Sequence, residues 1–364
     1  MFNIIHILLY GFIALGFLVI VHEFGHFLMA KLTGVKVITF SIGFGPKILK
    51  FKKGETEYAV SAIPLGGYVK LLGESPEEEV SEEEAQRSFS NKSPFVRILI
   101  AFIGPFFNIL LTMVLFYVIG VTGFPVPTTR VGSVTEGSPA QIAGIRAGDI
   151  VESVAGQKTE EWSQIPEAIE KVPIGPIPVE IRRGDKTIQL TITPAEITDK
   201  DSLGTTITRK IIGIKVSDEE RVKRLSLLES ASYAYLNTYY ISELTVVFLG
   251  RLIQGKLSLK TIGGPILIFK EAGRRAQKGF NYYIHFVALI SINLAILNLL
   301  PIPILDGGHI LFNLIEAVIR KKISQRTINI AQQVGLFIII CLMILAFYND
   351  FDRMFNLSKF FHGK

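Results

Sequence analysis

The chain has 364 residues, of which 49% are hydrophobic, with a mean hydropathy of +0.41 and a formal net charge of +6. This composition is too apolar for an ordinary soluble domain and indicates a polytopic membrane protein. No basic stretch interleaves with aromatic residues, so we expect no nucleic-acid partner. Cys341 is the single cysteine, which excludes an internal disulfide and a cysteine-based zinc cluster.

Four apolar segments are long enough to cross a bilayer, which requires about 20 residues. They cover residues 2–21, 98–121, 282–300 and 328–348. The first lacks the basic start and small-residue cleavage site of a signal peptide, so we expect it to be retained as a span.

The loop after the first span is rich in glycine and β-forming residues. Residues 36–53 and 57–72 are predicted to form short strands joined by glycine turns. The acidic run at residues 74–84 is predicted to be a solvated loop.

A large insert separates the second and third spans, and it contains β-patterned runs at residues 178–182 and 187–193. After it, residues 225–252 are apolar but interrupted by Glu229, Asn237 and Glu243. Hydropathy leaves this segment open between a fifth span and an amphipathic helix on the membrane surface.

Basic residues indicate the orientation. The short loop before the last span carries Arg320, Lys321, Lys322 and Arg326 and no acid between them, which predicts a cytoplasmic position. The lysine-rich first loop fits the same side. We therefore expect the insert and both termini to face outward.

The first span leads into a metal-binding motif, His22-Glu23-Phe24-Gly25-His26. Two histidines four residues apart lie on one face of a helix and can share one zinc ion, while Glu23 can act as a general base on the water that zinc activates. The alternative is that three polar groups simply lie at a helix end near the interface. That arrangement is costly beside an apolar span unless the groups are partnered.

A third ligand is required, and Asp306 is the strongest candidate. It follows two prolines that break the third span and precedes two glycines, so we expect it in unwound chain at membrane depth. A re-entrant turn capped by Asp306 is the alternative. The other candidates are four histidines: His6, His285, His309 and His362.

The third ligand also bears on the number of spans. With four spans, the first and third run in the same direction, and Asp306 reaches the same cytoplasmic depth as His22 and His26. A fifth span would put Asp306 at the opposite face of a core about 30 Å thick. The metal site therefore favours four spans and a surface position for residues 225–252.

These residues resemble the site-2 proteases, intramembrane zinc metalloproteases, in their bacterial form with a PDZ-like insert. The resemblance also covers the Gly43-Phe44-Gly45 hairpin, Gly104-Pro105 with Asn108, and Gly263-Gly264-Pro265. The combination of HExxH with Leu305-Asp306-Gly307 in a late span makes it specific.

The resemblance implies roles for the site residues. Asp306 would be the third zinc ligand beside His22 and His26, and Glu23 the catalytic base. Asn298 would contact the substrate backbone or the developing oxyanion, or else make an interhelical hydrogen bond. For Asn293 the interhelical bond is favoured.

The resemblance also concerns the hairpin residues Gly43, Phe44 and Gly45. They would re-enter the membrane and pair with an extended substrate, since strand addition exposes a peptide bond that a helix shields. An ordinary turn is the alternative.

The PDZ resemblance rests on short motifs between residues 131 and 156, including Ser138 as a helix N-cap and Pro139 at the first helical position. Such a domain would bind a peptide and act as a size filter for substrates that another protease has already trimmed. A rigid lid without a ligand is the alternative.

The expected fold is an α-helical polytopic membrane protein with four transmembrane helices, a membrane-associated β-hairpin region and an inserted PDZ-like α+β domain. We expect membrane core at 1–123 and 282–364, the PDZ-like domain at 124–217 and an amphipathic surface segment at 218–281. The expected site is a zinc site facing the cytoplasmic side of a bacterial inner membrane.

The expected activity is Zn²⁺-dependent cleavage of single-span membrane proteins, such as trimmed anti-sigma factors or remnant signal peptides. A catalytically idle scaffold would usually have lost one of the four key residues. A metal transporter would need more ligands and a repeated helix pattern, and no internal repeat is present.

Overall fold

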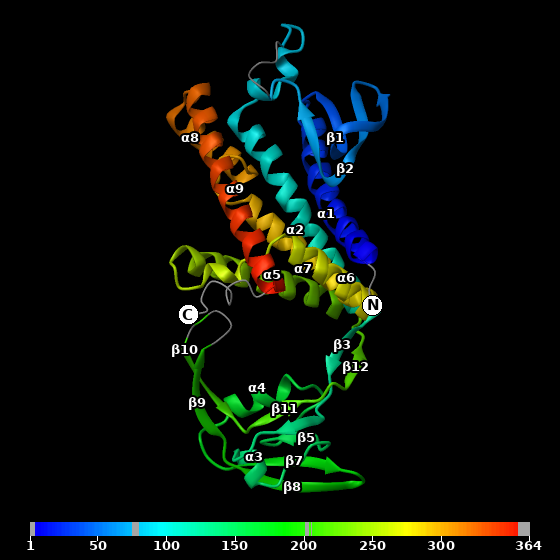
Figure 1. Ribbon diagram of the computed structural model, residues 1–364, viewed down its shortest axis with the longest axis vertical. Coiled ribbons are helices and arrows are strands. Elements are labelled where there is room, and N and C mark those ends of the chain that lie inside the picture. Colours follow the sequence, from blue (N-terminus) through cyan, green and yellow to red (C-terminus); the bar gives the residue numbers. More distant parts are fainter. Residues whose placement is uncertain (1–3, 75–79, 201–203, 205, 356–364) are drawn as a thin grey trace. The chain divides into compact units, whose positions relative to one another are not determined.

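The computed structural model describes residues 4–74, 80–200, 204 and 206–355 and divides into two compact units. One contains Gly120–Ser226 and Gln254–Leu257. We call it the PDZ-position unit because it includes the residues predicted to form the PDZ-like domain. The other, the membrane unit, contains the preceding residues, Leu227–Ile253 and the residues from Ser258 onward (Figure 1).

Four helices among the described residues are long and apolar enough to cross a membrane: α1 (Ile4–Leu32), α2 (Pro94–Thr122), α7 (Phe280–Asn298) and α9 (Gln325–Phe355). The first is longer than predicted, so the HExxH motif lies inside the helix rather than at its end. Helix α1 ends at Leu32, and Gly34, with a φ of 69°, lies within the turn that the Val35 N–H closes on the Ala30 carbonyl.

Helices α1 and α7 run in the same direction, as the proposed third ligand requires. Near their starts, the Tyr283 hydroxyl donates to the Tyr10 carbonyl at 2.8 Å. Near the end of α7, Asn298 Nδ2 lies 3.3 Å from His22 Nε2. Asp306 therefore reaches the level of the two histidines.

Strands β1 (Val37–Lys53) and β2 (Thr56–Leu71) correct the prediction of short strands, because each is long and strongly irregular in register. Residues 37–42 pair with residues 67–71 and are also in register with residues 57–60. The positive φ angles of Gly43 and Gly45 permit the bend of β1. The bent hairpin thus forms a small sheet with residues 67–71 at one edge.

The remaining helices of the membrane unit are α5 (Leu227–Ile253), α6 (Pro265–Lys278) and α8 (Asp306–Ile319), with short 3₁₀ turns at Ala85–Arg87, Phe89–Asn91 and Leu259–Thr261. Helix α5 is not among the four apolar spans. Its buried face consists of Ser230, Ala234, Thr238 and Ile241. The neighbouring aromatic residues, including Tyr235 and Tyr239, are exposed. This amphipathic pattern fits a helix on the membrane surface, which remains a prediction.

The PDZ-position unit is α+β. Its central sheet has the order β6-β5-β7-β8, formed by Gln157–Lys158, Ile150–Val154, Ile177–Arg183 and Lys186–Ile192. Helices α3 (Pro139–Ile142) and α4 (Gln164–Lys171) complete the unit with three two-stranded sheets. Those sheets pair β3 (Phe124–Pro127) with β12 (Glu220–Lys223), β4 (Val131–Val134) with β11 (Ile214–Val216), and β9 (Ala195–Lys200) with β10 (Thr206–Ile211).

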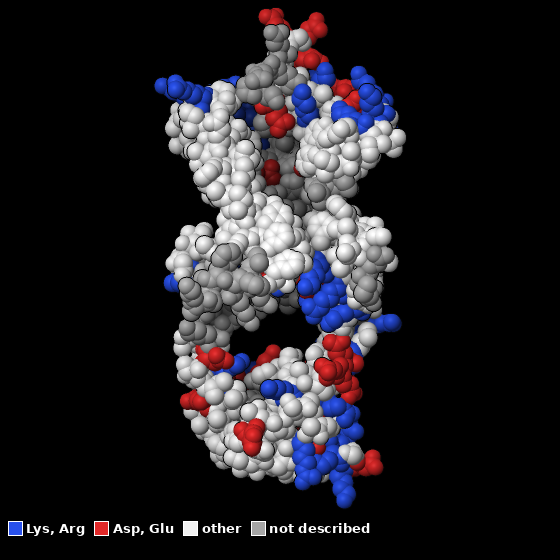
Figure 2. All heavy atoms as spheres, viewed as in Figure 1, with Lys and Arg blue, Asp and Glu red and all other residues white. Residues whose placement is uncertain are grey.

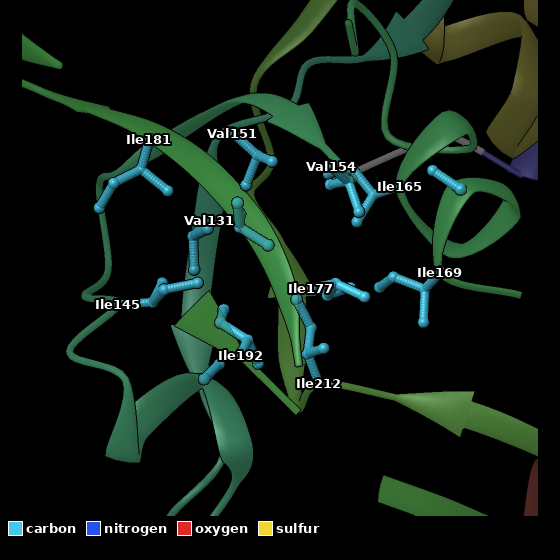
Figure 3. Close-up of a cluster of buried hydrophobic side chains, with 13 residues drawn as sticks. Val131, Ile145, Val151, Val154, Ile165, Ile169, Ile177, Ile181, Ile192 and Ile212 are labelled. Carbon is cyan, nitrogen blue, oxygen red and sulfur yellow. The ribbon is translucent and has the colours of Figure 1, made fainter. Parts of the chain in front are cut away.

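This unit has its own apolar core, in which branched aliphatic side chains from the strands meet Ile165 and Ile169 of α4 (Figure 3). The predicted cap is confirmed, because the Ser138 side chain accepts from the Gln141 N–H with Pro139 at the start of α3. The unit extends beyond the predicted 124–217. Strand β12 returns to pair with β3, so residues 218–226 belong here and not to the membrane-surface segment.

Candidate metal centre

Three side chains from two helices meet at one point in the membrane unit. His22 and His26 project from α1, and Asp306 is the first residue of α8. Their ligand atoms all lie within 4.8 Å of one another. Asp306 therefore begins a helix, rather than lying in unwound chain as expected, while residues 299–305 before it form the predicted break.

The spacing of these atoms fits a zinc ion. His22 Nε2 lies 3.1 Å from Asp306 Oδ2 and 3.1 Å from His26 Nε2, and His26 Nε2 lies 3.5 Å from Asp306 Oδ1. A tetrahedral zinc ion with bonds of about 2.0–2.1 Å separates its ligand atoms by roughly 3.3 Å. The three side chains thus have the donor set and the spacing that zinc requires.

The ring of His26 is fixed by the backbone of α2. His26 Nδ1 donates to the Ile100 carbonyl at 2.7 Å, which leaves Nε2 with its lone pair directed at the ligand cluster. Gly104 provides the space, because a Cβ at that position would lie 2.3 Å from His26 Nε2. A Cβ on Gly25 would likewise meet the Ile103 carbonyl at 2.8 Å. Two glycines therefore allow α1 and α2 to approach each other at the candidate metal ligands.

Asn108, one turn beyond Gly104, contacts the other ligand histidine. Its Nδ2 lies 3.4 Å from His22 Nδ1, and its buried Oδ1 has no partner among the described residues. Turning the amide by 180° exchanges these atoms and lets Oδ1 accept from the Nδ1–H of His22. The His22 ring also donates to the Gly104 carbonyl. Both acceptors favour a His22 tautomer with Nε2 free for a metal.

Glu23 lines the same cavity as the three ligands but lies outside the ligand cluster. Its carboxylate accepts a hydrogen bond from the backbone N–H of Val69 in the edge segment of β2. A Cβ on Gly67 would lie 3.5 Å from Glu23 Cγ and 2.7 Å from the Ser41 carbonyl. The edge of the small sheet is therefore directly beside the candidate base.

The predicted hairpin residues do not line the cavity themselves but lie next to residues that do. Gly43, Phe44 and Gly45 are not among its lining residues, whereas Tyr68 and Val69 are. The Phe44 ring stacks on the Tyr68 ring with centroids 6.2 Å apart. Sequence reasoning missed Tyr68 and Val69, and the only signal was the glycine pair that precedes them.

The other candidates have different positions. Asn298 lies beside His22, as described above, whereas Asn293 accepts a hydrogen bond from Thr245 of α5 at 2.8 Å, which is the interhelical role that was favoured. His309 lines the cavity without joining the ligand cluster, and His285 packs edge-on against Phe116.

The terminal histidines are remote from the cluster in the sequence. His6 is in the first turn of α1. His362 lies outside the described residues.

Comparison with known proteins gives consistent matches. The model of peptidase family M50 matches residues 10–342. A Campylobacter jejuni protein provisionally named a zinc metalloprotease is 36% identical, over 94% of this chain and 92% of its own. The zinc metalloprotease RasP of Geobacillus kaustophilus is 30% identical, over 94% of this chain and 97% of its own.

Among solved structures, the PDZ domain of an SdrC-like protein from Listeria monocytogenes is 24% identical. The match covers 25% of this chain and 90% of that one, with a TM-score of 0.21.

Proposed function

This chain is a multi-pass membrane zinc metallopeptidase of peptidase family M50, the family of the site-2 proteases, and we propose that it hydrolyses peptide bonds within the transmembrane segments of single-span membrane proteins. One observation carries the proposal. The two histidine ligands and the candidate base lie within an apolar helix long enough to cross a membrane. A site on such a helix is suited to a substrate that is itself in the bilayer.

His22, His26 and Asp306 would hold the metal. Zinc, when bound, polarises a carbonyl and lowers the pKa of water to about 7. Glu23 takes the proton from the attacking water and returns it to the leaving amine. The Val69 N–H of the sheet edge lies beside this carboxylate. Asn298 would donate to the reacting carbonyl, a role supported by its Nδ2 lying 3.3 Å from His22 Nε2.

We propose the edge segment, residues 67–71, as the strand on which an extended substrate is held. It is at one edge of the sheet and touches Glu23 through Gly67 and Val69. Strand addition would unwind a substrate helix and bring a peptide bond to the cavity. Phe44, stacked on Tyr68, would support this edge, with Gly43 and Gly45 setting the bend.

The wider proposal concerns location and substrates. Four spans in a bacterial cytoplasmic membrane would put the metal site toward the cytoplasm and the PDZ-position unit and both termini outside, as the basic loop at Arg320–Arg326 indicates. The PDZ-position unit would bind a peptide or limit substrate size. Trimmed anti-sigma factors or remnant signal peptides are the proposed substrates.

Cleavage of a trimmed single-span reporter by the purified full chain tests the proposal, with the cleavage position determined by mass spectrometry. We expect Glu23→Gln to lower the rate by at least about 100-fold and to retain zinc. Glu243→Gln, the same change on an exposed residue of α5, should cut like wild type. Cleavage outside the reporter's span, or an active Glu23→Gln protein, would refute the proposal.

A further inference from the structure

A second cavity in the membrane unit lies between the start of α2 and the end of α8. Its lining includes five basic residues: Lys92, Arg97, Arg320, Lys321 and Lys322. Its one acidic residue is Glu316, which is already neutralised: Arg97 Nη2 donates to Oε2 at 2.5 Å and the Ile323 N–H donates to Oε1 at 2.9 Å. The cavity therefore has a net positive charge.

Most of this charge has no carboxylate partner in the described part of the chain. Among the described residues, no carboxylate pairs with Lys92, Arg320 or Lys321, and Lys322 Nζ donates only to the Ser90 carbonyl at 3.0 Å. Arg97 Nε is buried and has no hydrogen-bond partner in the described part of the chain. Several donors thus remain available for an anion rich in oxygen acceptors.

The cavity is also at the boundary of the apolar spans. Helix α2 begins at Pro94, two residues after Lys92, and α9 begins at Gln325, three residues after Lys322. Phe95 in the cavity lining is 72% exposed and the nearby Val318 is 81% exposed. In Figure 2, Lys and Arg side chains gather at the end of the membrane unit where α8 ends, next to a surface with few charges.

We propose that this cavity is a binding site for an anionic phospholipid. The phosphate would accept hydrogen bonds from Lys92, Lys321 and Lys322, and the acyl chains would lie along Phe95 and Val318. A basic cavity at the end of transmembrane helices suits an anionic headgroup. A soluble phosphate would leave the exposed apolar side chains without a partner. The site is separate from the metal centre, so this inference does not depend on the proposed peptidase substrate.

Native mass spectrometry of the full chain in detergent tests the site, with phosphatidylglycerol and phosphatidylcholine of identical acyl chains as probes. We expect one phosphatidylglycerol molecule to bind at least tenfold more tightly than phosphatidylcholine. Each basic residue near an anionic headgroup strengthens binding roughly fivefold. The triple variant Lys92→Gln/Lys321→Gln/Lys322→Gln should therefore weaken binding by about 100-fold.

A matched control removes the same charge elsewhere. Lys50→Gln/Lys52→Gln/Lys53→Gln changes three exposed lysines of β1 and should alter binding less than about threefold. The triple arginine variant at positions 92, 321 and 322 keeps the charge and should bind like wild type, which excludes misfolding as the cause of a loss.

Any of four results would overturn the proposal. The first three are equal loss of binding in the glutamine triple and its control, no preference for phosphatidylglycerol, and loss of binding in the arginine variant. The fourth is displacement of the lipid by millimolar sn-glycerol 3-phosphate, because it would identify a site for soluble phosphates.

Discussion

The two units of this chain differ most in the aliphatic side chains that they leave exposed. The PDZ-position unit fully buries aliphatic side chains such as Val154 and Ile181. The membrane unit exposes many of its aliphatic side chains, such as Ile344 at 65%, and buries polar ones such as Asn108, Thr112 and Ser291. The first pattern is typical of a domain in water, and the second of helices that face lipid and meet through small and polar residues. The two parts of this chain are therefore stabilised in different environments, one by an aliphatic core in water and the other by contacts between helices that face lipid.

The largest expected effect tests close helix approach in the membrane unit. In Gly104→Ala the new Cβ would lie 2.3 Å from His26 Nε2, so we expect zinc content to fall below about a tenth and cleavage by at least about 100-fold. Zinc is measured by elemental analysis. Gly250→Ala in α5, where a Cβ meets nothing within 4 Å, is the control and should keep both. A fully loaded Gly104→Ala protein would show that the contact is not needed.

A core truncation tests the tight aliphatic packing of the PDZ-position unit. Ile181→Ala should lower the free energy of unfolding of the PDZ-position unit by about 2–4 kcal/mol, because it leaves a cavity in a packed core. Trp162 is the single tryptophan and packs on this core, so its fluorescence during urea unfolding reports on this unit. The same truncation at the exposed Ile344 should leave the Trp162 transition in place. Equal shifts of the Trp162 unfolding transition in the two variants would contradict this difference between the units.

A smaller effect is expected from a buried polar residue near the metal. Asn108→Leu removes an acceptor for the His22 ring, so we expect zinc affinity to fall about tenfold to 100-fold. Competition with a chelator measures this. Thr112→Val removes a buried hydroxyl one turn away, which donates to the Asn108 and Ala288 carbonyls, and should change zinc affinity less than about threefold. Similar losses in both variants would indicate helix packing rather than a specific contact.

The smallest effect concerns a carboxylate in the PDZ-position unit. Burial of Asp149 disfavours its charge, but hydrogen bonds from Arg183 and the Arg146 N–H outweigh this and hold the pKa of the carboxyl below its usual range. Its contribution is therefore present above the unfolded pKa of about 3.9 and is lost as pH falls through the lower folded value.

Urea unfolding followed by Trp162 fluorescence between pH 3 and 7 measures this contribution. Asp149→Asn should cost about 1.5 kcal/mol at pH 7 and flatten the acid side of the profile. Asp185→Asn, in the exposed turn between β7 and β8, should keep the wild-type profile. An unchanged acid side in Asp149→Asn would refute the assignment.

Local patterns predicted the parts of the site that depend on one helix or one chain break. The spacing of His22 and His26 and the prolines before Asp306 indicated three candidate ligands, and the structure brings these side chains together. The contacts of Asn108 and Val69 could not be predicted, because they depend on how α2 and the bent sheet pack against α1. The irregular register of β1 and β2 could not be predicted for a similar reason, because residues 37–42 have partners on two sides.

Helix α8 is fastened at both ends to different partners. Its first residue, Asp306, belongs to the metal cluster, and Glu316, ten residues later, is paired with Arg97 of α2. At a rise of 1.5 Å per residue these attachments are about 15 Å apart. The helix is thus attached at its start through Asp306, which lies 3.1 Å from His22 Nε2, and near its end through the ion pair with α2. A bound zinc ion would strengthen the first attachment, and its removal would leave the second unchanged.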